Sequence, residues 1–501
     1  MPPTSILAAL MAHAGADPAR PCVVWGEATI GYGELAAAAA GWAAAYAALG
    51  VARGDRVALY LGSGPGFLGA YLGAHAAGAA AVLVNTQYRQ VELRHILADS
   101  EPRAVVADAE GAARLAELGG DPPVLTADPG QLAPPAAAER GQAGPLATSA
   151  PGDLAILAYT SGTTGRAKGA MLTHGALAAN SAAVCAAWRW TAADRLLLVL
   201  PLFHIHGLGV GVHGTLMAGA SLVLRPRFDP AEALADLAGG ACTMFFGVPT
   251  IYTRLIQEAG GRRQVTEGVR LFVSGSAPLS PQTFADFEAL FGQRILERYG
   301  MTETGMNLTN PYAGERRPGT VGGPFPGQQA RVVDPRAREP LPDGEVGEIQ
   351  VRGPHLFAGY WRNPAATAEV LAPDGWFSTG DLGWRSADGY YTLTGRAREL
   401  IISGGYNVYP REVEELLLAH PAVAECAVLG LPDPDFGERV VAAVVPADPA
   451  APPTQAELDA FCREGLAAYK RPRELHLLDA LPRNAMGKVQ KHELRARLSG
   501  G

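Results

Sequence analysis

Short apolar runs that alternate with helical patterns constrain the fold of this chain more than any other feature. Between Leu154 and Leu308 the runs LAILAY, RLLLVL, SLVLR, TMFFGV and RLFVSG are separated by segments such as SPQTFADFEALF, which places Ser280 as a cap and Pro281 in the first helical turn. Alternating strands and helices indicate a largely parallel sheet covered by helices. The preceding segment repeats the pattern, because DRVALYLG and PRAVVAD flank Ala-rich helices. The sequence therefore predicts an α/β fold whose large N-terminal body contains two related layers.

The pattern changes twice toward the C-terminus. Between Gly319 and Gly395 short strands are broken by Gly, Pro and Asp-Gly turns, which is typical of a β-rich subdomain. Strand ELIISG, helix PREVEELLLAH, strands AECAVLG and VVAAVV and helix TQAELDAFCREGL then follow in residues 397–501. We therefore expect a large domain over residues 1–396 and a small, mobile α+β domain over residues 397–501. The Ala/Pro/Gly-rich residues 131–153 read as a surface linker.

Composition excludes several classes of protein. With 501 residues, 48% of them hydrophobic and 18% charged, the chain is not disordered, collagenous or a coiled coil. A net charge of -8 provides no general attraction to nucleic acid or to an anionic membrane. The five cysteines form no C-x-x-C pair, so we expect neither disulfides nor a zinc site, and a reducing, cytoplasmic location.

Two apolar segments could suggest a membrane or a secretion signal. The N-terminal run has no basic residue before it and reads as a first helix rather than a signal peptide. The segment from Gly64 to Val84 contains Pro65, several glycines and His75 and ends in the strand-like AAVLVN. This pattern favours a helix followed by a buried strand, and we expect no transmembrane segment.

The motif YTSGTTGRAKG, from Tyr159 to Gly169, overlaps the end of the apolar run LAILAY. Backbone N–H groups and hydroxyls packed this densely can surround a polyphosphate, and Lys168 adds positive charge. The motif is not a Walker A loop, which has four residues between its glycine and its Gly-Lys pair and a Ser or Thr after the lysine. A mobile Gly-rich turn is the alternative, which the unbroken run TSGTTG behind a buried strand disfavours.

Two further motifs follow buried strands. In YGMTE, Thr302 and Glu303 offer oxygen ligands for a phosphate-bound Mg²⁺, and Tyr299 offers a flat face for adenine, although a glutamate in such a place is more often only solvated. In GSAPL, which begins at Gly275, small residues let a planar base approach the backbone, unless the motif is a plain strand-to-helix turn.

The run TSGTTGRAKG resembles the phosphate loop of the acyl-adenylate-forming superfamily, which includes acyl-CoA synthetases, adenylation domains and luciferases. YGMTE resembles its magnesium and adenine motif, STGD (378–381) its ribose motif, GRAREL (395–400) its hinge and PRNAMGK (482–488) its C-terminal lysine motif. The motifs span most of the chain in the family order. The resemblance implies ATP and coenzyme A as co-substrates, Mg²⁺ as cofactor, and two steps: acyl-AMP forms, then the small domain rotates and a thiol attacks.

The resemblance also implies roles for individual residues. Catalysis is assigned to Lys488, which stabilises charge during adenylation, and to Glu303, Thr302 and His204. Glu303 and Thr163 are the metal ligands, and the hinge and coenzyme A passage involve Arg398, Gly404 and Gly405. The nucleotide contacts are Thr160, Ser161, Gly162, Thr163, Thr164, Gly165, Lys168, Gly275, Ser276, Ala277, Pro278, Tyr299, Gly300, Met301, Asp381 and Arg396.

The family builds its acyl pocket from the segments that read PLFHIHGL, FFGVPT, GSAPL and ERYGM here. No acid follows Phe203, where amino-acid-activating relatives hold an ammonium group, so an amino-acid substrate is disfavoured. A guanidinium at Arg298 suits a second substrate carboxylate, unless Arg298 pairs with a structural acid. We expect His204 to position the reacting carboxylate beside Ser276, and His206 to be structural.

The pocket segments look most like those of malonyl-CoA synthetases. We therefore predict ligation of malonate, or alternatively methylmalonate, to coenzyme A, giving malonyl-CoA, AMP and pyrophosphate. An acyl-CoA synthetase for another short acid and a catalytically silent nucleotide-binding member stay as alternatives. Arg316 and Arg317 are rival sites for the second carboxylate, and Arg398 stands where the family often has Lys or Asp. We expect only small-molecule partners and a monomer or weak dimer.

Overall fold

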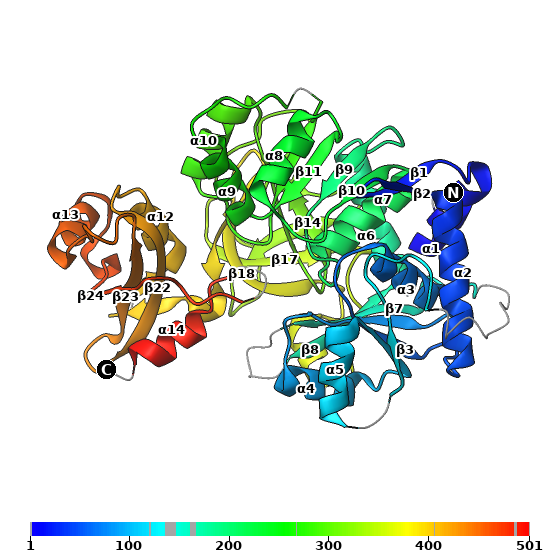
Figure 1. Ribbon diagram of the computed structural model, residues 1–501. Coiled ribbons are helices and arrows are strands. Elements are labelled where there is room, and N and C mark those ends of the chain that lie inside the picture. The colour runs from blue at the N-terminus through cyan, green and yellow to red at the C-terminus, as the bar shows by residue number, and fades with distance from the viewer. Residues whose placement is uncertain are drawn as a thin grey trace. The chain divides into compact units, whose positions relative to one another are not determined.

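The computed structural model describes residues 3–119, 122–135, 147–160, 167–266, 268–404, 406–484 and 488–499 (Figure 1). The chain divides into two compact units, Met1–Leu279 with Thr283–Ala330 and Val351–Phe377, and Ser280–Gln282 with Arg331–Gln350 and Ser378–Gly501. The predicted α/β fold, a large body of layered sheets with a smaller C-terminal part, is confirmed. The domain boundary after residue 396 stays a prediction.

The first layer is a six-stranded sheet with the order β6-β5-β3-β4-β7-β8. Its pairs are parallel except for β7 with β8, which are antiparallel. Figure 1 shows α4 and α5 beside β3 and β8. The strands are β3 (Arg56–Tyr60), β4 (Ala80–Leu83), β5 (Ala104–Ala107), β6 (Val124–Thr126), β7 (Leu154–Thr160) and β8 (Lys168–Thr173). The helices of this part are α1 (Ile6–Ala16), α2 (Tyr32–Ala48), α3 (Pro65–Ala76), α4 (Gln90–Ser100) and α5 (Ala109–Leu118).

The second layer is a nine-stranded sheet with the order β15-β14-β13-β12-β11-β9-β10-β1-β2. Its centre is parallel, and antiparallel pairs close both edges. The strands are β1 (Pro21–Trp25), β2 (Ala28–Gly31), β9 (Arg195–Leu198), β10 (Ser221–Leu224), β11 (Met244–Gly247), β12 (Leu271–Ser274), β13 (Leu296–Met301), β14 (Gly305–Thr309) and β15 (Gly323–Pro324). The intervening helices are α6 (His174–Ala187), π-helix η2 (His206–Val212), α7 (His213–Ala218), α8 (Pro230–Ala238), α9 (Pro249–Ala259) and α10 (Pro281–Phe291).

The helix that begins at Pro281 lies where the sequence predicted it. Proline suits the first turn because its fixed φ is already helical and no N–H is lost there. In the core, the rings of Phe272 and Phe287 lie 5.0 Å apart, and those of Tyr252 and Phe287 lie 5.2 Å apart. Aromatic packing therefore fixes α9 and α10 against the sheet.

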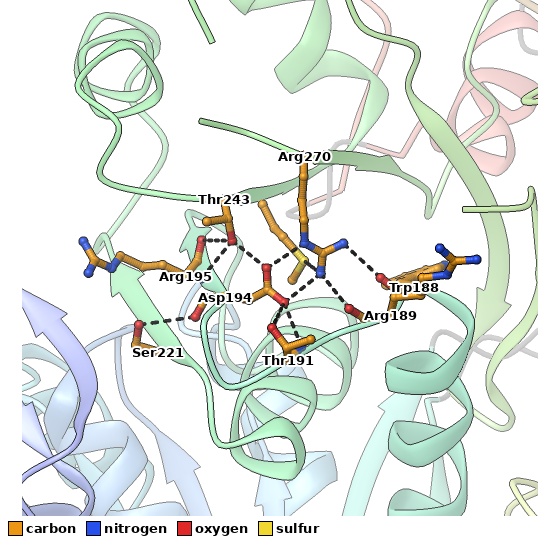
Figure 2. A network of polar contacts seen from close by, with 9 residues as sticks. Trp188, Arg189, Thr191, Asp194, Arg195, Ser221, Thr243 and Arg270 are labelled. Carbon is orange, nitrogen blue, oxygen red and sulfur yellow. Dashed lines mark hydrogen bonds and ion pairs between the residues drawn. The ribbon is translucent and has the colours of Figure 1, made fainter. Parts of the chain in front are cut away.

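A polar network joins the beginnings of three central strands (Figure 2). The carboxylate of Asp194 accepts hydrogen bonds from Arg270 Nε at 2.7 Å and Arg270 Nη2 at 2.8 Å. Asp194 also accepts hydrogen bonds from the backbone N–H of Thr191 at 2.7 Å and from the hydroxyl of Thr243 at 2.8 Å. Arg270 in turn donates to the carbonyl of Trp188. The network satisfies a buried charge with several hydrogen bonds, as burial of a charge requires.

A buried histidine cluster, consisting of His75, His174 and His213, lies within the same unit. The rings of His75 and His174 are 4.6 Å apart, and His213 Nε2 is 2.7 Å from the hydroxyl of Tyr71. Burial lowers the pKa of His174 to about 4 and that of His213 to about 3, and it lowers the pKa of His75 well below its usual value. These imidazoles are therefore neutral at pH 7.

The second unit contains a sheet with the order β21-β20-β23-β22, to which β24 adds beside β23. Apolar clusters cover both faces of this sheet, one under α12 and α13 and the other under α14. Its strands are β20 (Ile401–Ser403), β21 (Tyr406–Val408), β22 (Val423–Asp433), β23 (Gly437–Pro446) and β24 (Glu474–Leu477). The helices are η3 (Ala397–Glu399), α12 (Pro410–Leu418), α13 (Gln455–Gly465), η4 (Ala468–Lys470) and α14 (Lys491–Leu498).

The predicted β-rich segment forms the four-stranded sheet β16-β17-β18-β19. Its strands are β16 (Gln329–Val333), β17 (Gly347–Arg352), β18 (Phe377–Arg385) and β19 (Tyr391–Arg396), and the short helix α11 (Pro364–Val370) precedes β18. The segment from Gly64 to Val84 forms α3 and β4 as expected, and no helix in the described ranges is long and apolar enough to cross a membrane. Residues 136–146 of the expected linker lie outside the described residues.

Candidate functional site

The two ends of the predicted phosphate loop lie side by side. Thr160 ends β7, Lys168 begins β8, and the two residues are direct partners in the antiparallel register. The residues between them that the sequence assigns to nucleotide or metal, Ser161, Gly162, Thr163, Thr164 and Gly165, lie outside the described residues. The β7–β8 hairpin nevertheless fixes where the loop begins and ends.

Glu303 lies in the turn between β13 and β14 and is buried, with 6% exposure. Its Oε1 accepts a hydrogen bond from the hydroxyl of Tyr360 at 2.9 Å and one from Thr160 Oγ1 at 3.4 Å. The ammonium of Lys168 lies 5.3 Å from the centre of the Tyr360 ring. Glu303 and Lys168 therefore both contact the side chain of Tyr360, and Thr160 joins this group through its hydrogen bond to Glu303.

Sequence reasoning missed Tyr360. Its position follows from backbone pairing, because Trp361 N–H donates to the carbonyl of Gly169 and Met171 N–H donates to the carbonyl of Gly359. The only local signal was an aromatic hydroxyl in the segment GYWRNP. That signal does not show which strand the segment pairs with.

The residues at Glu303 fit the magnesium ion that the family implies. A carboxylate beside hydroxyl groups is a hard oxygen set, and Mg²⁺ is commonly held by one or two carboxylates together with substrate phosphates. In the described part of the chain no group of three or more His, Cys, Asp or Glu could hold a metal ion alone. Glu303 is accordingly the candidate ligand, with substrate phosphate oxygens completing the coordination; Thr163 is outside the described residues.

The GSAPL segment follows the end of β12, and its serine is linked to two histidines by hydrogen bonds. Ser276 has a φ of 71°, in the left-handed region, and its hydroxyl is 3.1 Å from His206 Nδ1. The backbone N–H of His206 donates to His204 Nδ1 at 3.3 Å. His206, expected to be structural, thus connects the two residues that the sequence assigned to the acyl site. Ala277 and Pro278 are exposed at the following turn.

The β13–β14 hairpin presents the YGMTE residues. Tyr299 is buried, and its hydroxyl is 3.8 Å from Met301 Sδ. A Cβ at Gly300 would lie 2.2 Å from the carbonyl oxygen of Gly305, so the hairpin requires glycine there. Thr302 is half-buried in the turn beside Glu303.

Arg298 lies on β13 with only 2% exposure. Its Nε and Nη2 have no hydrogen-bond partner among the described residues. A Cβ at Gly275 would lie 2.5 Å from the guanidinium carbon, so the side chain packs directly on this glycine. Burial lowers the pKa of Arg298 to about 9, and the guanidinium stays charged at pH 7. An acid partner for Arg298, the alternative that the sequence left open, is absent from the described part of the chain.

The rival arginines have partners. Arg316 donates to the carbonyl of Arg294 at 2.6 Å and to that of Tyr312 at 3.2 Å. Arg317 forms an ion pair with Glu315 at 3.0 Å. Arg316 and Arg317 thus have polar partners within the protein, whereas Nε and Nη2 of Arg298 have none among the described residues.

The expected ribose residues meet within the second unit. Asp381 on β18 and Arg396 on β19 are direct cross-strand partners, and Arg396 Nε lies 2.8 Å from Asp381 Oδ1. Arg398 is exposed in η3. Gly404 follows β20 with a φ of 58°, which favours glycine, and Gly405 lies outside the described residues.

Lys488 is exposed in a closed turn of the same unit. Its backbone N–H donates to Asn484 Oδ1 at 3.0 Å, and its carbonyl accepts from the N–H of Asn484 at 2.9 Å. Arg483 and Val489 form an isolated bridge around the turn. Hydrogen bonds to Asn484 therefore hold the backbone of Lys488 in place.

Two family models match this chain. Residues 10–361 match the AMP-binding enzyme model, and residues 412–488 match that of the AMP-binding enzyme C-terminal domain. The chain belongs to the AMP-binding enzyme family. It is an acid–CoA ligase of the AMP-forming kind, which works through an acyl-adenylate and uses ATP and coenzyme A.

The similar proteins differ in the acid that they are named for. The sulfoacetate–CoA ligase of Cupriavidus necator is 42% identical over 470 residues, which cover 92% of this chain and 91% of the relative. The malonate–CoA ligase of Arabidopsis thaliana is 35% identical, with 90% of this chain and 79% of the relative covered. The crystal structure of ATP-bound MatB from Rhodopseudomonas palustris is 41% identical, with a TM-score of 0.93, and the match covers 100% of this chain and 99% of that one.

Proposed function

We propose that this enzyme joins malonate to coenzyme A, giving malonyl-CoA, AMP and pyrophosphate, with methylmalonate as an alternative substrate. The observation that carries the proposal is the buried guanidinium of Arg298, whose Nε and Nη2 have no partner among the described residues. A buried charge without a partner is costly, and an arginine is well shaped to bind a carboxylate with two hydrogen bonds. The second carboxylate of malonate supplies that partner.

The acids for which two relatives are named have the size and charge of the proposed substrate. Malonate carries a second anionic group one methylene away from the reacting carboxylate, and so does sulfoacetate, the acid for which another relative is named. The structure places the two proposed anion-binding groups close together. Arg298 packs on Gly275, and Gly275 directly precedes Ser276 in the chain. We propose that His204 and Ser276 hold the reacting carboxylate while Arg298 holds the second anion.

The proposed reaction has two steps. A carboxylate oxygen attacks the α-phosphorus of ATP, and the bond to pyrophosphate breaks. Lys488 stabilises the negative charge that develops on the phosphate, and Thr160, Lys168 and the loop between them bind the phosphates. The thiol sulfur of coenzyme A then attacks the acyl carbon, its proton is lost to solvent, and AMP leaves as the carbon–oxygen bond breaks.

The remaining assignments stay proposals. Glu303 would hold Mg²⁺, which supplies positive charge to the phosphates. Asp381, next to Arg396, would bind the ribose hydroxyls. Arg398 and the glycines 404 and 405 would serve the coenzyme A step, with residues 397–501 acting as the mobile domain.

Pyrophosphate release from the purified protein tests the proposal. The assay contains ATP, Mg²⁺ and coenzyme A with malonate, methylmalonate, sulfoacetate, succinate or acetate, and Lys488→Ala is the catalytic control. We expect malonate to give the highest kcat/KM and acetate to fall about 10- to 100-fold lower, because acetate leaves the guanidinium unpaired. Equal rates with acetate would contradict the role of Arg298, whereas a preference for sulfoacetate would keep that role and replace the substrate.

A pair of arginine variants separates the candidate carboxylate sites. Arg298→Met removes the buried guanidinium, and Arg317→Met removes one that is already paired with Glu315. We expect only the first to abolish the preference for malonate over acetate. Loss of the preference in Arg317→Met alone would move the site to the rival arginine.

A further inference from the structure

We propose that Lys491 is a positioning residue, whose ion pairs with two glutamates hold the start of α14 and thereby the turn that presents Lys488. The inference rests on the proposed catalytic role of Lys488 and adds the residue that keeps this lysine in place. Lys491 itself need not touch the substrate.

Lys491 is the first residue of α14. Its Nζ lies 2.7 Å from Glu414 Oε1 and 3.4 Å from Glu399 Oε2. Glu414 belongs to α12, and its Oε1 also accepts a hydrogen bond from the backbone N–H of Val428 on β22 at 2.8 Å. One ammonium therefore joins the start of the last helix to α12 and η3.

The connection from Lys491 to Lys488 is short and tightly bonded. Only Val489 and Gln490 lie between them, and Gln490 N–H donates to the carbonyl of Pro482 at 2.8 Å. This bond joins the start of α14 to the other side of the turn, which the Asn484 hydrogen bonds close. A shift of the helix start is therefore transmitted to the backbone of Lys488.

The charges at this position explain why a cation is needed. Burial by itself lowers the pKa of Lys491, but the carboxylates of Glu414 and Glu399 raise it above its usual value, so the ammonium is charged at pH 7. Without it, both carboxylates lose their shared cation, Glu414 keeps only the hydrogen bond from Val428 N–H, and the two like charges repel each other. Removal of the ammonium is thus expected to displace α14 rather than to leave it unchanged.

The effect on catalysis depends on how far Lys488 can be displaced before adenylation slows. A misplacement of a catalytic group by about 1 Å can lower the rate about 100-fold. Because Lys488 stabilises the transition state rather than binding ATP tightly in the ground state, displacement of Lys488 lowers kcat more than it changes the KM for ATP.

The chain supplies a matched control. Lys470 forms an ion pair with Glu412, also on α12, at 2.6 Å, but Lys470 lies in η4, 18 residues before Lys488 in the sequence. Lys470→Met and Lys491→Met therefore each remove one ammonium that is paired with a glutamate of α12. A purely structural role would give the two variants similar effects on activity.

The test measures ATP–pyrophosphate exchange with malonate, which reports adenylation alone. We expect Lys491→Met to lower kcat about 10- to 100-fold with a change in the KM for ATP of less than about threefold, and Lys470→Met to stay within about threefold of wild type. Lys491→Arg, which keeps a cation beside both carboxylates, should recover most of the rate. If Lys491→Met does not fold, Glu414→Gln takes its place, with an expected loss of about threefold or more.

A double variant gives the decisive comparison. If Lys491 acts through Lys488, adding Lys491→Met to Lys488→Ala lowers the residual exchange by less than about twofold. An undiminished effect in that background, or equal activities of the two methionine variants, would overturn the inference. Failure of the proposed function has a different signature: wild type would show no malonate-dependent exchange, or Lys488→Ala would keep the wild-type rate.

Discussion

The packing of Arg298 on Gly275 gives a sharp prediction for Gly275→Ala. A Cβ at this position would lie 2.5 Å from the guanidinium carbon, 2.6 Å from Nε and 2.7 Å from Nη1. Ordinary contacts begin near 3.4 Å, so the guanidinium has to move by about 1 Å. The backbone of Gly275 is not in the left-handed region, so the alanine adds no backbone strain.

The displacement should remove the hydrogen bonds to the second substrate anion. Hydrogen bonds to charged groups contribute about 1.5–3 kcal/mol, so we expect kcat/KM for malonate to fall about 10- to 100-fold. For acetate, which has no second anion, the change should be less than about threefold. The ratio of the two kcat/KM values, measured by pyrophosphate release, is therefore the informative quantity.

The matched control is Gly152→Ala, because a Cβ at Gly152 has no atom within 4 Å. This variant should keep the wild-type ratio. A malonate-to-acetate ratio in Gly275→Ala that stays within twofold of wild type would refute the reasoning, since the guanidinium would then be either mobile or irrelevant to selection.

Three other perturbations are directed at stability and at the phosphate site. Asp194→Ala leaves the guanidinium of Arg270 without its carboxylate, and thermal unfolding should show a loss of about 3–5 kcal/mol; a loss below about 1 kcal/mol would mean that the network is redundant. Tyr360→Phe removes a hydrogen bond to Glu303, and titrations of activity with ATP and Mg²⁺ should show a KM for ATP raised about threefold or more, while an unchanged KM would exclude a role for the hydroxyl. The buried histidine cluster has pKa values lowered by burial, so the unfolded state binds more protons below pH 6.5. Stability should therefore fall as the pH drops from 6.5 toward 4, by up to about 1.4 kcal/mol per unit for each histidine, as urea unfolding at several pH values would show. A flat profile over this range would contradict neutral histidines in the folded state.

Local signals predicted the strands and helices because each depends on short stretches of sequence. Pro281 begins α10 as expected, and the apolar segment that ends at Val84 forms a helix and a buried strand rather than a membrane span. The two layers were also foreseen, from the alternation of the pattern. What the sequence did not reveal is long-range pairing: β1 joins β10 in the second sheet, and no local property of Val23 indicates its partner Leu222.

The same limit applies to the candidate site. Thr160, Lys168 and Glu303 could be identified from motifs, and in the structure Glu303 contacts both Thr160 and Tyr360, while Lys168 lies over the Tyr360 ring. Tyr360 lies outside the motifs from which the site was predicted, and its place depends on pairing with β8. Likewise, the contact between His206 and Ser276 depends on a φ of 71° at the serine, a backbone conformation that a serine seldom adopts.

The scarcity of lysine has a chemical consequence for an enzyme that makes activated acids. The chain has four lysines among 41 basic residues, and guanidinium groups resist the acylation that amines undergo. Lys470 and Lys491 are held by carboxylates, and Lys168 lies against the ring of Tyr360. Acyl-AMP that escapes attack by the thiol therefore meets few nucleophilic amines on this protein, and the composition limits the damage that the reaction intermediate can do to its own catalyst.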